Sequence, residues 1–456
     1  MTARPALAAA ALAAAPAVAL AHATDRAVIL TLPTGYYLAG AAAAVALTAL
    51  AGALAPRLPD PRPHRLVTRS VLVPRPVISW LACLALAGLV AIGFLGSRDP
   101  MHNPLVLAIW TLFWVGLPLA CLLLGNLFRP INPWYGPVRT ARGLLGRTRS
   151  IGLARLGRWP AVAGLLAFAW FEIVSLAPAD PAVLARALAG YWLAVFLLGL
   201  LEGEDWLDRG ETFAVYFSLI GRIAPLWHEP EGARTRLMAG LPGTQILAMP
   251  PLGASGAAFV TLMLAAVSFD GLSETFRWLA FLGVNPLEFP GRSAVKGVNT
   301  LGLLGAWALV AASILGAIAL GRRLAGATTP FAADAGPWML SFLPIAAGYH
   351  VAHYLVALLT DGQYAIVALG DPFDRGWNPF GLGVNWVSFG MLAEQSSAHT
   401  IWNAQFAAIL GAHLLAVILG LKLAAPARPL AHAPMTLLMV LYTVFGLWLL
   451  STATGA

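Results

Sequence analysis

The chain alternates between long apolar runs and short polar segments that are rich in arginine. Each apolar run has about the 20 residues that an α-helix needs to cross a bilayer. Because lipid offers no hydrogen-bond partners to a free backbone, such runs are expected to be helical. The pattern therefore predicts an all-α fold, a polytopic transmembrane helical bundle with about ten spans. The predicted spans are residues 35–55, 76–96, 104–127, 159–178, 182–201, 252–270, 299–320, 337–359, 400–421 and 433–452.

The composition supports this class of protein. Of the 456 residues, 59% are hydrophobic and only 11% are charged, which excludes an ordinary soluble globular protein. The formal net charge is +8, but the arginines fall between the apolar runs, so they indicate membrane topology and not a nucleic-acid surface. We expect the lipid bilayer as a partner, and no nucleic acid. Cys83 and Cys121 lie inside apolar runs and are expected to be core residues.

The first 21 residues have the pattern of a secretory signal peptide. They begin with Arg4, continue as an alanine-rich apolar stretch and end in an A-x-A pattern at Ala21. This predicts a signal peptide over 1–21 and a single polytopic membrane domain over 22–456. Cleavage there would make His22 the new N-terminus, whose amine and imidazole together suit copper. The alternatives are cleavage after Ala23 or no cleavage.

The distribution of lysine and arginine predicts an orientation. With the mature N-terminus outside, the predicted inner loops hold 20 of these residues and the predicted outer segments hold six. The positive-inside rule then predicts a multi-pass inner-membrane protein with both the mature N-terminus and the C-terminus outside.

Two connections are expected to carry structure. The segment from Glu211 to Trp227 is apolar but interrupted by Arg222 and Pro225, which predicts an interfacial or re-entrant helix on the inner side. The outer segment 363–398 is rich in glycine, proline, aspartate and tryptophan. It could cap a site at the outer face or serve as a simple connector.

The strongest candidate for chemistry is the sequence GYHVAHY at residues 348–354, inside the eighth apolar run. His350 and His353 are three residues apart, so a helix presents both on one face. Ionisable residues at membrane depth are costly, and this spacing suits one metal ion or one proton relay. The alternative is that both imidazoles are neutral and hydrogen-bond to neighbouring helices.

Further ionisable residues are predicted to converge on the same outer half of the membrane. Glu172, Asp270 and His399 lie near the outer ends of their spans, as the His350–His353 pair does. Histidine and carboxylate ligands around one cavity would suit a divalent metal such as zinc or copper, with Asp270 or Glu172 as a further ligand or a general base. The same groups could instead relay protons.

Three further polar residues of the ninth span are candidates for substrate contact or proton relay, namely Asn403, Gln405 and the deeper His413. For Glu172 the structural alternative is an ion pair with Arg186, because a very short turn joins the fourth and fifth spans. No HExxH, CxxC, GxSxG or Walker motif is present to define a reaction.

Several short motifs, spread over most of the chain, resemble bacterial integral-membrane proteins of the fenitrothion hydrolase family. They are FWVGLP at 113–118, GNLFRPINPW at 125–134, RGETF at 209–213, SFDG at 268–271, GYHVAHY at 348–354, GAH at 411–413 and the Ala21–His22 junction. The resemblance implies a bacterial inner-membrane protein that hydrolyses an organophosphorus triester and releases a nitrophenol.

Three functions are consistent with the sequence. The first is a membrane-bound hydrolase in which His350 and His353 hold a metal that activates water for attack on a hydrophobic ester. The second is a transporter or a copper- or metal-handling protein that uses the same buried histidines and carboxylates. The third is a structural subunit that anchors a membrane partner complex or a homo-oligomer.

Overall fold

The computed structural model describes residues 34–54, 60–285, 291–383, 386–424 and 429–452. The predicted signal peptide and His22 lie outside these residues. Within them, nine helices are long and apolar enough to cross a membrane. The predicted all-α, multi-pass helical bundle is therefore confirmed, and the protein is a membrane-embedded one whose apolar helices contact a lipid bilayer.

Each of the ten predicted apolar runs coincides with a helix. Seven are single helices of membrane length: α2 (Thr34–Leu54), α3 (Arg75–Leu95), α9 (Pro181–Glu202), α13 (Ala254–Ser273), α15 (Arg292–Ala325), α19 (Gln395–Leu423) and α20 (Pro429–Ser451). Two are composite: α4 (Pro104–Leu107), η2 (Ala108–Gly116) and α5 (Leu117–Leu124) in one, and α16 (Phe331–Ser341) with α17 (Leu343–Gly370) in the other. The tenth, α8 (Trp159–Val174), has only 16 residues.

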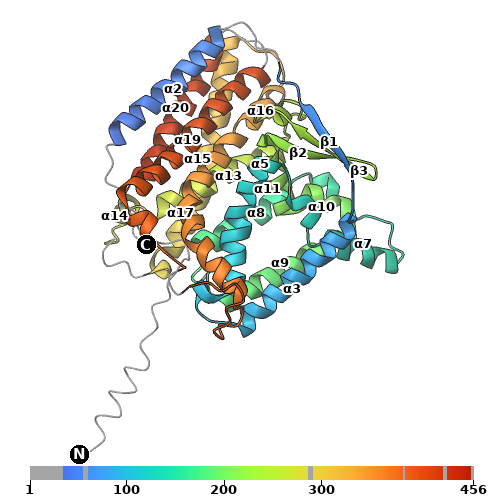
Figure 1. Ribbon diagram of the computed structural model, residues 1–456. Helices are drawn as coiled ribbons and strands as arrows, with labels where there is room; N and C mark the ends of the chain where they lie inside the picture. The colour runs from blue at the N-terminus through green and yellow to red at the C-terminus, as the bar shows by residue number, and fades with distance from the viewer. Residues whose placement is uncertain (1–33, 55–59, 286–290, 384–385, 425–428, 453–456) are drawn as a thin grey trace, which may run out of the picture.

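The centre of the bundle is formed by α13 and by the pair α16 and α17. In the apolar window of α13, 72% of residues are buried, and in that of α16 and α17, 67% are buried, against 11% in α3 and 17% in α15. Figure 1 shows α2, α15, α19 and α20 on one side of this centre and α3 and α9 on the other. The central helices therefore hold the residues that lipid cannot reach.

Shorter elements fill the connections. They are η1 (Pro100–His102), α6 (Phe128–Ile131), α7 (Tyr135–Leu144), η3 (Leu153–Leu156), α10 (Glu204–Gly210), α11 (Thr212–Ile220), η4 (Gly221–Ile223), α12 (Thr244–Leu247), α14 (Phe276–Phe281) and α18 (Gly390–Ala393).

A small antiparallel sheet, which the sequence analysis did not predict, joins two of the predicted inner loops. Its strands are β1 (His64–Ser70), β2 (Leu226–Glu231) and β3 (Arg234–Ala239), in the order β1-β3-β2. The register pairs Ser70 with Arg234 and His64 with Ala239, with an irregularity between Arg65 and Val67. Because β1 pairs with β3, the two loops lie at the same end of the bundle, which we call the sheet end.

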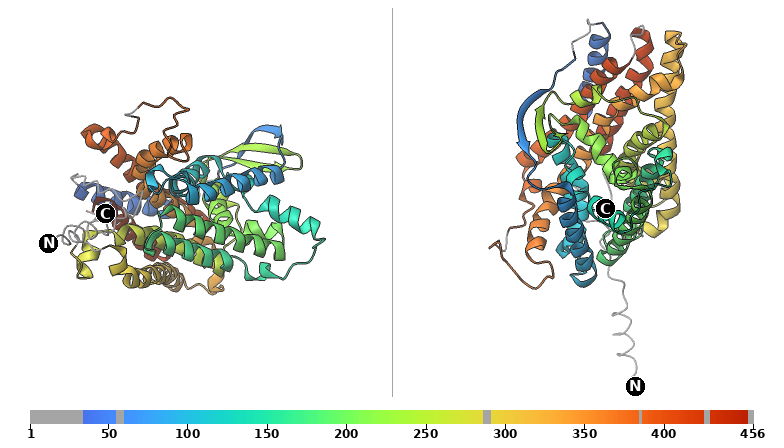
Figure 2. Two further views of the ribbon diagram at one scale, coloured as in Figure 1. Left: turned by 90° about the horizontal axis from the view of Figure 1, so that it is seen from below. Right: turned by 90° about the vertical axis from the view of Figure 1, so that its right-hand side faces the viewer.

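Contacts also connect the other predicted loops at each end. At the sheet end, Lys422 Nζ lies 2.9 Å from Asp60 Oδ1. At the opposite end, which we call the distal end, Asp374 accepts a hydrogen bond from Ser97 and lies 3.5 Å from His102. Figures 1 and 2 show the sheet and the connection between α17 and α19 at different ends of the molecule. These contacts agree with the prediction that successive loops lie at opposite ends of the bundle.

The segment predicted as an interfacial or re-entrant helix is helical but lies inside the protein. The helix α11 begins after Glu211, whose carboxylate accepts hydrogen bonds from the backbone N–H groups of Phe213 and Ala214. Of its nine residues, all but Ser218 are buried. The last two residues of the predicted segment belong to β2 instead. A proline and an arginine after Ile220 end the helix before it can cross the bundle.

Candidate functional site

A chain of hydrogen bonds joins four polar side chains from three helices. Tyr354 Oη lies 2.8 Å from Glu172 Oε1 and 2.8 Å from Asp270 Oδ2. His353 Nε2 lies 2.9 Å from the same Asp270 oxygen. Glu172, Asp270 and Tyr354 are buried, whereas the His353 side chain is 26% exposed. The chain therefore runs from a partly exposed imidazole to a buried carboxyl group.

The ends of two helices bring the carboxylates together. Glu172 lies two residues before the end of α8, and Asp270 lies three residues before the end of α13. Both helices run from the sheet end to the distal end, so the two side chains reach similar depths. His353 and Tyr354 lie on α17, which packs against α13. The predicted convergence of Glu172, Asp270 and His353 is thus seen in the structure, and Tyr354 is the residue that connects it.

His350 lies on the same helix but has different partners. Its Nε2 atom is 2.7 Å from the backbone oxygen of Trp114, and its Nδ1 atom is 3.2 Å from Tyr216 Oη. A carbonyl oxygen only accepts, so Nε2 carries the proton and Nδ1 accepts from the Tyr216 hydroxyl. Both nitrogens of His350 are therefore used in contacts with protein, as in the alternative interpretation of a neutral histidine that hydrogen-bonds to neighbouring helices.

The free carbonyl of Trp114 has a cause in the sequence. In a regular α-helix it would accept from the N–H group four residues later, but that residue is Pro118, which has none. Residues 108–116 form the π-helical segment η2, in which the Leu117 N–H bonds to the Leu112 oxygen. Such segments are frequent at functional sites. Here the segment leaves a backbone oxygen available to His350.

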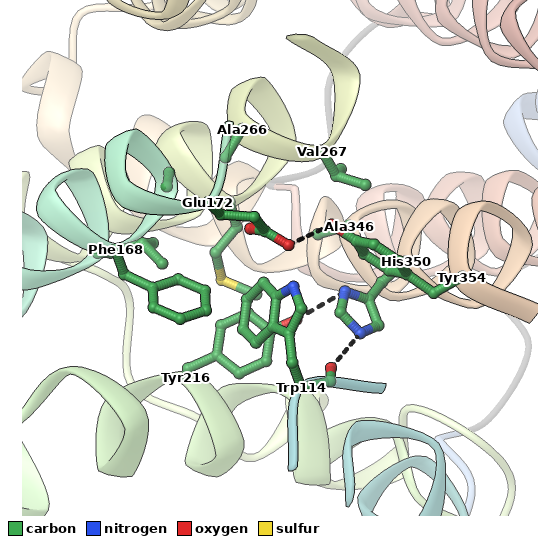
Figure 3. A pocket seen from close by; sticks show the side chains of 12 residues that line it. Trp114, Phe168, Glu172, Tyr216, Ala266, Val267, Ala346, His350 and Tyr354 are labelled. Carbon is green, nitrogen blue, oxygen red and sulfur yellow. Dashed lines mark hydrogen bonds between the residues drawn. The ribbon is translucent and has the colours of Figure 1, made fainter. Parts of the chain in front are cut away.

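A small cavity lies between Glu172 and His350. Its lining includes Trp114, Phe168 and Tyr216, and it offers about 20 Å³ to the centre of a water molecule. That volume holds about one water. Trp114 Nε1 is buried and has no hydrogen-bond partner among the described residues. Figure 3 shows the Trp114 indole and the Glu172 carboxylate facing each other across this space. A single water or one ligand atom is what the cavity can accept.

The structure separates the remaining candidate residues from this network. His399 is partly buried in the first turns of α19, and no hydrogen bond or ring contact connects it to His350 or His353. Asn403 is exposed. Gln405 donates to the backbone oxygen of Ala352 at 2.6 Å, which is a packing role between α17 and α19.

His413 lies in a separate buried cluster. Its Nδ1 atom is 2.8 Å from the Ile409 oxygen, and its ring lies 6.1 Å from that of Tyr349 and 6.3 Å from that of Tyr442. Its Nε2 atom has no hydrogen-bond partner among the described residues. Nothing in these contacts links His413 to the Glu172–His353 chain.

The described residues do not gather a set of metal ligands. Within the described part of the chain, no three His, Cys, Asp or Glu side chains form a group that could hold a metal ion. His350 offers no free nitrogen, since both of its ring nitrogens contact other protein groups. His353 has one free nitrogen, Nδ1, because Nε2 faces Asp270. The zinc or copper centre stays a prediction, and no step of the proposals below uses it.

The predicted alternative for Glu172 is also not seen. Arg186 is exposed on α9, and no ion pair joins it to Glu172. Arg292 approaches instead, donating to the backbone oxygens of Glu172 and Ser175 at 2.8 and 3.1 Å. The short turn makes α8 and α9 consecutive in the chain, but Arg186 lies on an exposed face of α9.

Sequence reasoning missed three residues of the site, namely Tyr354, Tyr216 and Trp114. Tyr354 belongs to the GYHVAHY motif and follows His353 directly, so the motif already contained it. Trp114 belongs to the FWVGLP motif at 113–118, and Tyr216 lies in the apolar segment from Glu211 to Trp227. Neither position indicated a contact with the site.

Comparison with known proteins gives no relative for this chain: no family model, curated protein or solved structure matches it.

Proposed function

We propose that the protein conducts protons between the distal face of the membrane and the buried Glu172, as the proton pathway of a membrane transporter. One observation carries the proposal. His353, Asp270, Tyr354 and Glu172 form an unbroken series of contacts of 2.8 to 2.9 Å that begins at a partly exposed imidazole and ends at a buried carboxyl group. Buried ionisable residues that pair with one another are typical of proton relays in membranes.

The proton count supports this role. A hydroxyl group has one proton, so Tyr354 can donate to one carboxylate and accept from the other if that one is protonated. The pair Glu172 and Asp270 then holds one proton, which can change sides when Tyr354 gives up its own proton and accepts another. Asp270 also contacts His353 through Nε2, and the other ring nitrogen, Nδ1, would exchange protons with water at the distal face. Each residue in the series can both accept and release a proton.

Beyond Glu172, the small cavity is the continuation of the pathway. A water there would lie between the Glu172 carboxyl group and the pair formed by Tyr216 and His350. Tyr216 belongs to α11, which is followed by η4 and the sheet. The series therefore leads from the distal end toward the sheet end of the molecule.

The experiment is proton flux into liposomes that contain purified protein and an internal pH dye, driven by a potassium diffusion potential. We expect flux in the wild type, and a loss of at least about tenfold in Glu172→Gln and His353→Ala. The matched control is His399→Ala, which removes a histidine from the same end of the molecule but outside the series, and its flux should equal that of the wild type. Equal flux in all four proteins would rule out the relay.

A second candidate, hydrolysis of a hydrophobic organophosphorus ester, is favoured by the pair of Asp270 and His353. A carboxylate that holds one imidazole nitrogen and leaves the other free is a general-base arrangement, which can remove a proton from an attacking water. The motifs at 268–271 and 348–354, which resemble fenitrothion hydrolases, contain these two residues. Neither residue needs a metal for this step.

Release of the nitrophenol from fenitrothion by protein in detergent tests this candidate. Hydrolysis is expected to fall by at least about 100-fold in His353→Ala, the typical contribution of a general base. The control His399→Ala should hydrolyse at the wild-type rate. Proton flux without any ester cleavage would support the relay and rule out the hydrolase. Ester cleavage without proton flux would support the hydrolase and rule out the relay.

We also propose the setting in which either function operates. The excess of arginine in the predicted inner loops supports a bacterial inner-membrane location, with the sheet end inside and both mature termini outside. The N-terminal pattern supports removal of residues 1–21 as a signal peptide. A membrane partner subunit or a second copy of the chain would contact the exposed apolar faces of the outer helices.

A further inference from the structure

A large apolar cavity is separate from the polar site. It has a volume of about 600 Å³ and lies between α3, η2, α8 and α9, with α6 and α11 closing it. We call it the apolar chamber. Figure 1 shows α8 on one side and the α3–α9 pair on the other. Phe168 lines both the chamber and the small cavity at Glu172.

The lining of the chamber offers no side-chain donor to a ligand. Its only polar side chains are three tryptophans and one tyrosine. The indole nitrogens of Trp110, Trp134 and Trp170 donate to Pro178, Trp192 and Thr300, and the Tyr191 hydroxyl donates to Glu211. Whatever fills the chamber must therefore be apolar along the part that lies inside.

The shape of the chamber suits two hydrocarbon chains side by side. Its lining spans Ala82–Leu89 on α3, 164–171 on α8 and 184–191 on α9, which is about 10 Å along each helix at 1.5 Å per residue. A volume of about 600 Å³ over that length gives a cross-section of roughly 60 Å². One acyl chain, with carbon contacts at about 4 Å, needs roughly 20 Å².

Positive charge lies beside the lining of the chamber on α6. Phe128 and Ile131 of α6 line it, and Arg129 lies between them with 47% of its side chain exposed. Arg129 shares Asp208 with Arg75, at 3.2 and 2.8 Å, so two guanidinium groups face one carboxylate and leave a net charge of +1. An anionic headgroup would be attracted to this position.

We propose that the apolar chamber binds one phospholipid, with both acyl chains between α3, α8 and α9 and its phosphate beside Arg129. The wall formed by α3 and α9 faces the bilayer through many exposed apolar residues, such as Leu81, Leu84, Leu193 and Leu197. The lipid would enter through that wall and lie one side chain, Phe168, away from the Glu172 cavity. This site is independent of the proton relay and of ester hydrolysis.

Native mass spectrometry of the purified full chain with added dioleoylphosphatidylglycerol tests the proposal. The wild type should retain one lipid. Ala187→Trp places an indole in the chamber and is expected to bind the lipid at least about tenfold more weakly, the equivalent of about two excluded methylene groups. The matched control is Ala194→Trp, the same change at an exposed position of α9 outside the chamber, which should retain the lipid as the wild type does.

Two further variants keep the test decisive. If Ala187→Trp does not fold, Ala85→Phe fills the chamber from the opposite wall on α3 and should show the same loss. Arg129→Gln should remove the preference for phosphatidylglycerol over dioleoylglycerol, which has the same chains and no phosphate. Equal retention in the wild type and both chamber-filling variants would overturn the proposal, as would retention of a small molecule in place of the lipid.

Discussion

Tyr354 is the residue that lets two buried carboxyl groups lie close together. Its hydroxyl is 2.8 Å from one oxygen of each. Glu172 accepts this hydrogen bond through Oε1, and the Trp114 indole faces the carboxyl group across the small cavity. A buried carboxyl group without a partner is costly, so Tyr354 contributes to stability as well as to the proposed relay.

We expect Tyr354→Phe to destabilise the protein by about 1–3 kcal/mol, because the ring remains while a buried carboxyl group loses its partner. Proton flux should fall with it. The control is Tyr349→Phe on the same helix, which removes a hydroxyl that donates to the Tyr442 backbone oxygen at 2.6 Å. Chemical unfolding in detergent gives the stability, and liposome flux gives the function. A loss of flux that is just as large in Tyr349→Phe would remove Tyr354 from the pathway.

For single residues, the sequence predicts the candidates for the site better than it predicts their hydrogen-bond partners. Spacing placed His350 and His353 on one helix, and both are on α17. Their partners differ because α13 meets the helix at His353 while η2 and α11 meet it at His350. The packing of the other helices decides which partner each histidine has. The spacing of residues within one helix cannot predict it. His399 lies near the correct end of its span, but depth alone does not bring it to the site.

Pro118 is the residue that shapes the π-helical segment η2. It supplies no N–H to the Trp114 oxygen, which accepts from His350 Nε2 at 2.7 Å instead. In Pro118→Ala the new N–H can take that oxygen and continue a regular helix. We expect a melting temperature equal to or above that of the wild type, together with a changed imidazole ¹⁵N NMR signal of His350. An unchanged His350 signal would mean that the proline does not control this contact.

The start of α11 is expected to make stability depend on pH. Burial raises the pKa of Glu211 to about 7, although hydrogen bonds from Tyr191, Phe213 and Ala214 oppose the rise. The folded protein then keeps this proton between about pH 4.5 and 7, where the unfolded chain releases it. Stability therefore falls as pH rises through this window, by no more than about 3 kcal/mol.

Unfolding free energies between pH 4.5 and 8 test this, with Glu211→Gln as the comparison. The variant has no carboxyl group at this position, so its stability should lack the part of the decline that comes from Glu211. The comparison is one of slopes, because both side chains are neutral in the folded protein below about pH 7. Parallel curves for the two proteins would contradict the assignment.

Elements were predictable where length and hydrophobicity define them. All ten apolar runs are helices, although several bounds differ, as for α15, which extends well beyond its predicted span of 299–320. The sheet was not predictable, since its strands are six or seven residues long and β1 is distant in sequence from β3. The one local signal is the Gly232–Ala233 turn between β2 and β3, where Gly232 has φ +61°.

The molecule as a whole has two ends that differ in structure and charge. The sheet and the ion pair of Lys422 with Asp60 define one end, and the contacts of Asp374 with Ser97 and His102 define the other. The alternation of loops between the two ends was predictable from the succession of apolar runs. It could not show the contacts among loops, which depend on how the spans pack.

Cysteine labelling with a membrane-impermeant maleimide tests the orientation in intact cells. The starting protein carries Cys83→Ala and Cys121→Ala, since both native cysteines lie in membrane helices. We expect Gln395→Cys, at the exposed start of α19, to react from outside. Thr148→Cys, exposed in the loop after α7, should react only after the cells are opened. The reverse result would invert the proposed topology and place the His353 end of the relay inside.

The pairing of β1 with β3 has a consequence for how the protein is made. The ribosome completes β1 before it has synthesised α3, α4, η2, α5, α8 and α9, and β3 follows all of them. At about 5–20 residues per second, β1 waits on the order of 10–30 s for its partner. During that time its backbone is an unpaired edge that other chains can bind. A ribosome that stalls before Arg234 would therefore leave a product that the cell can recognise as unfinished.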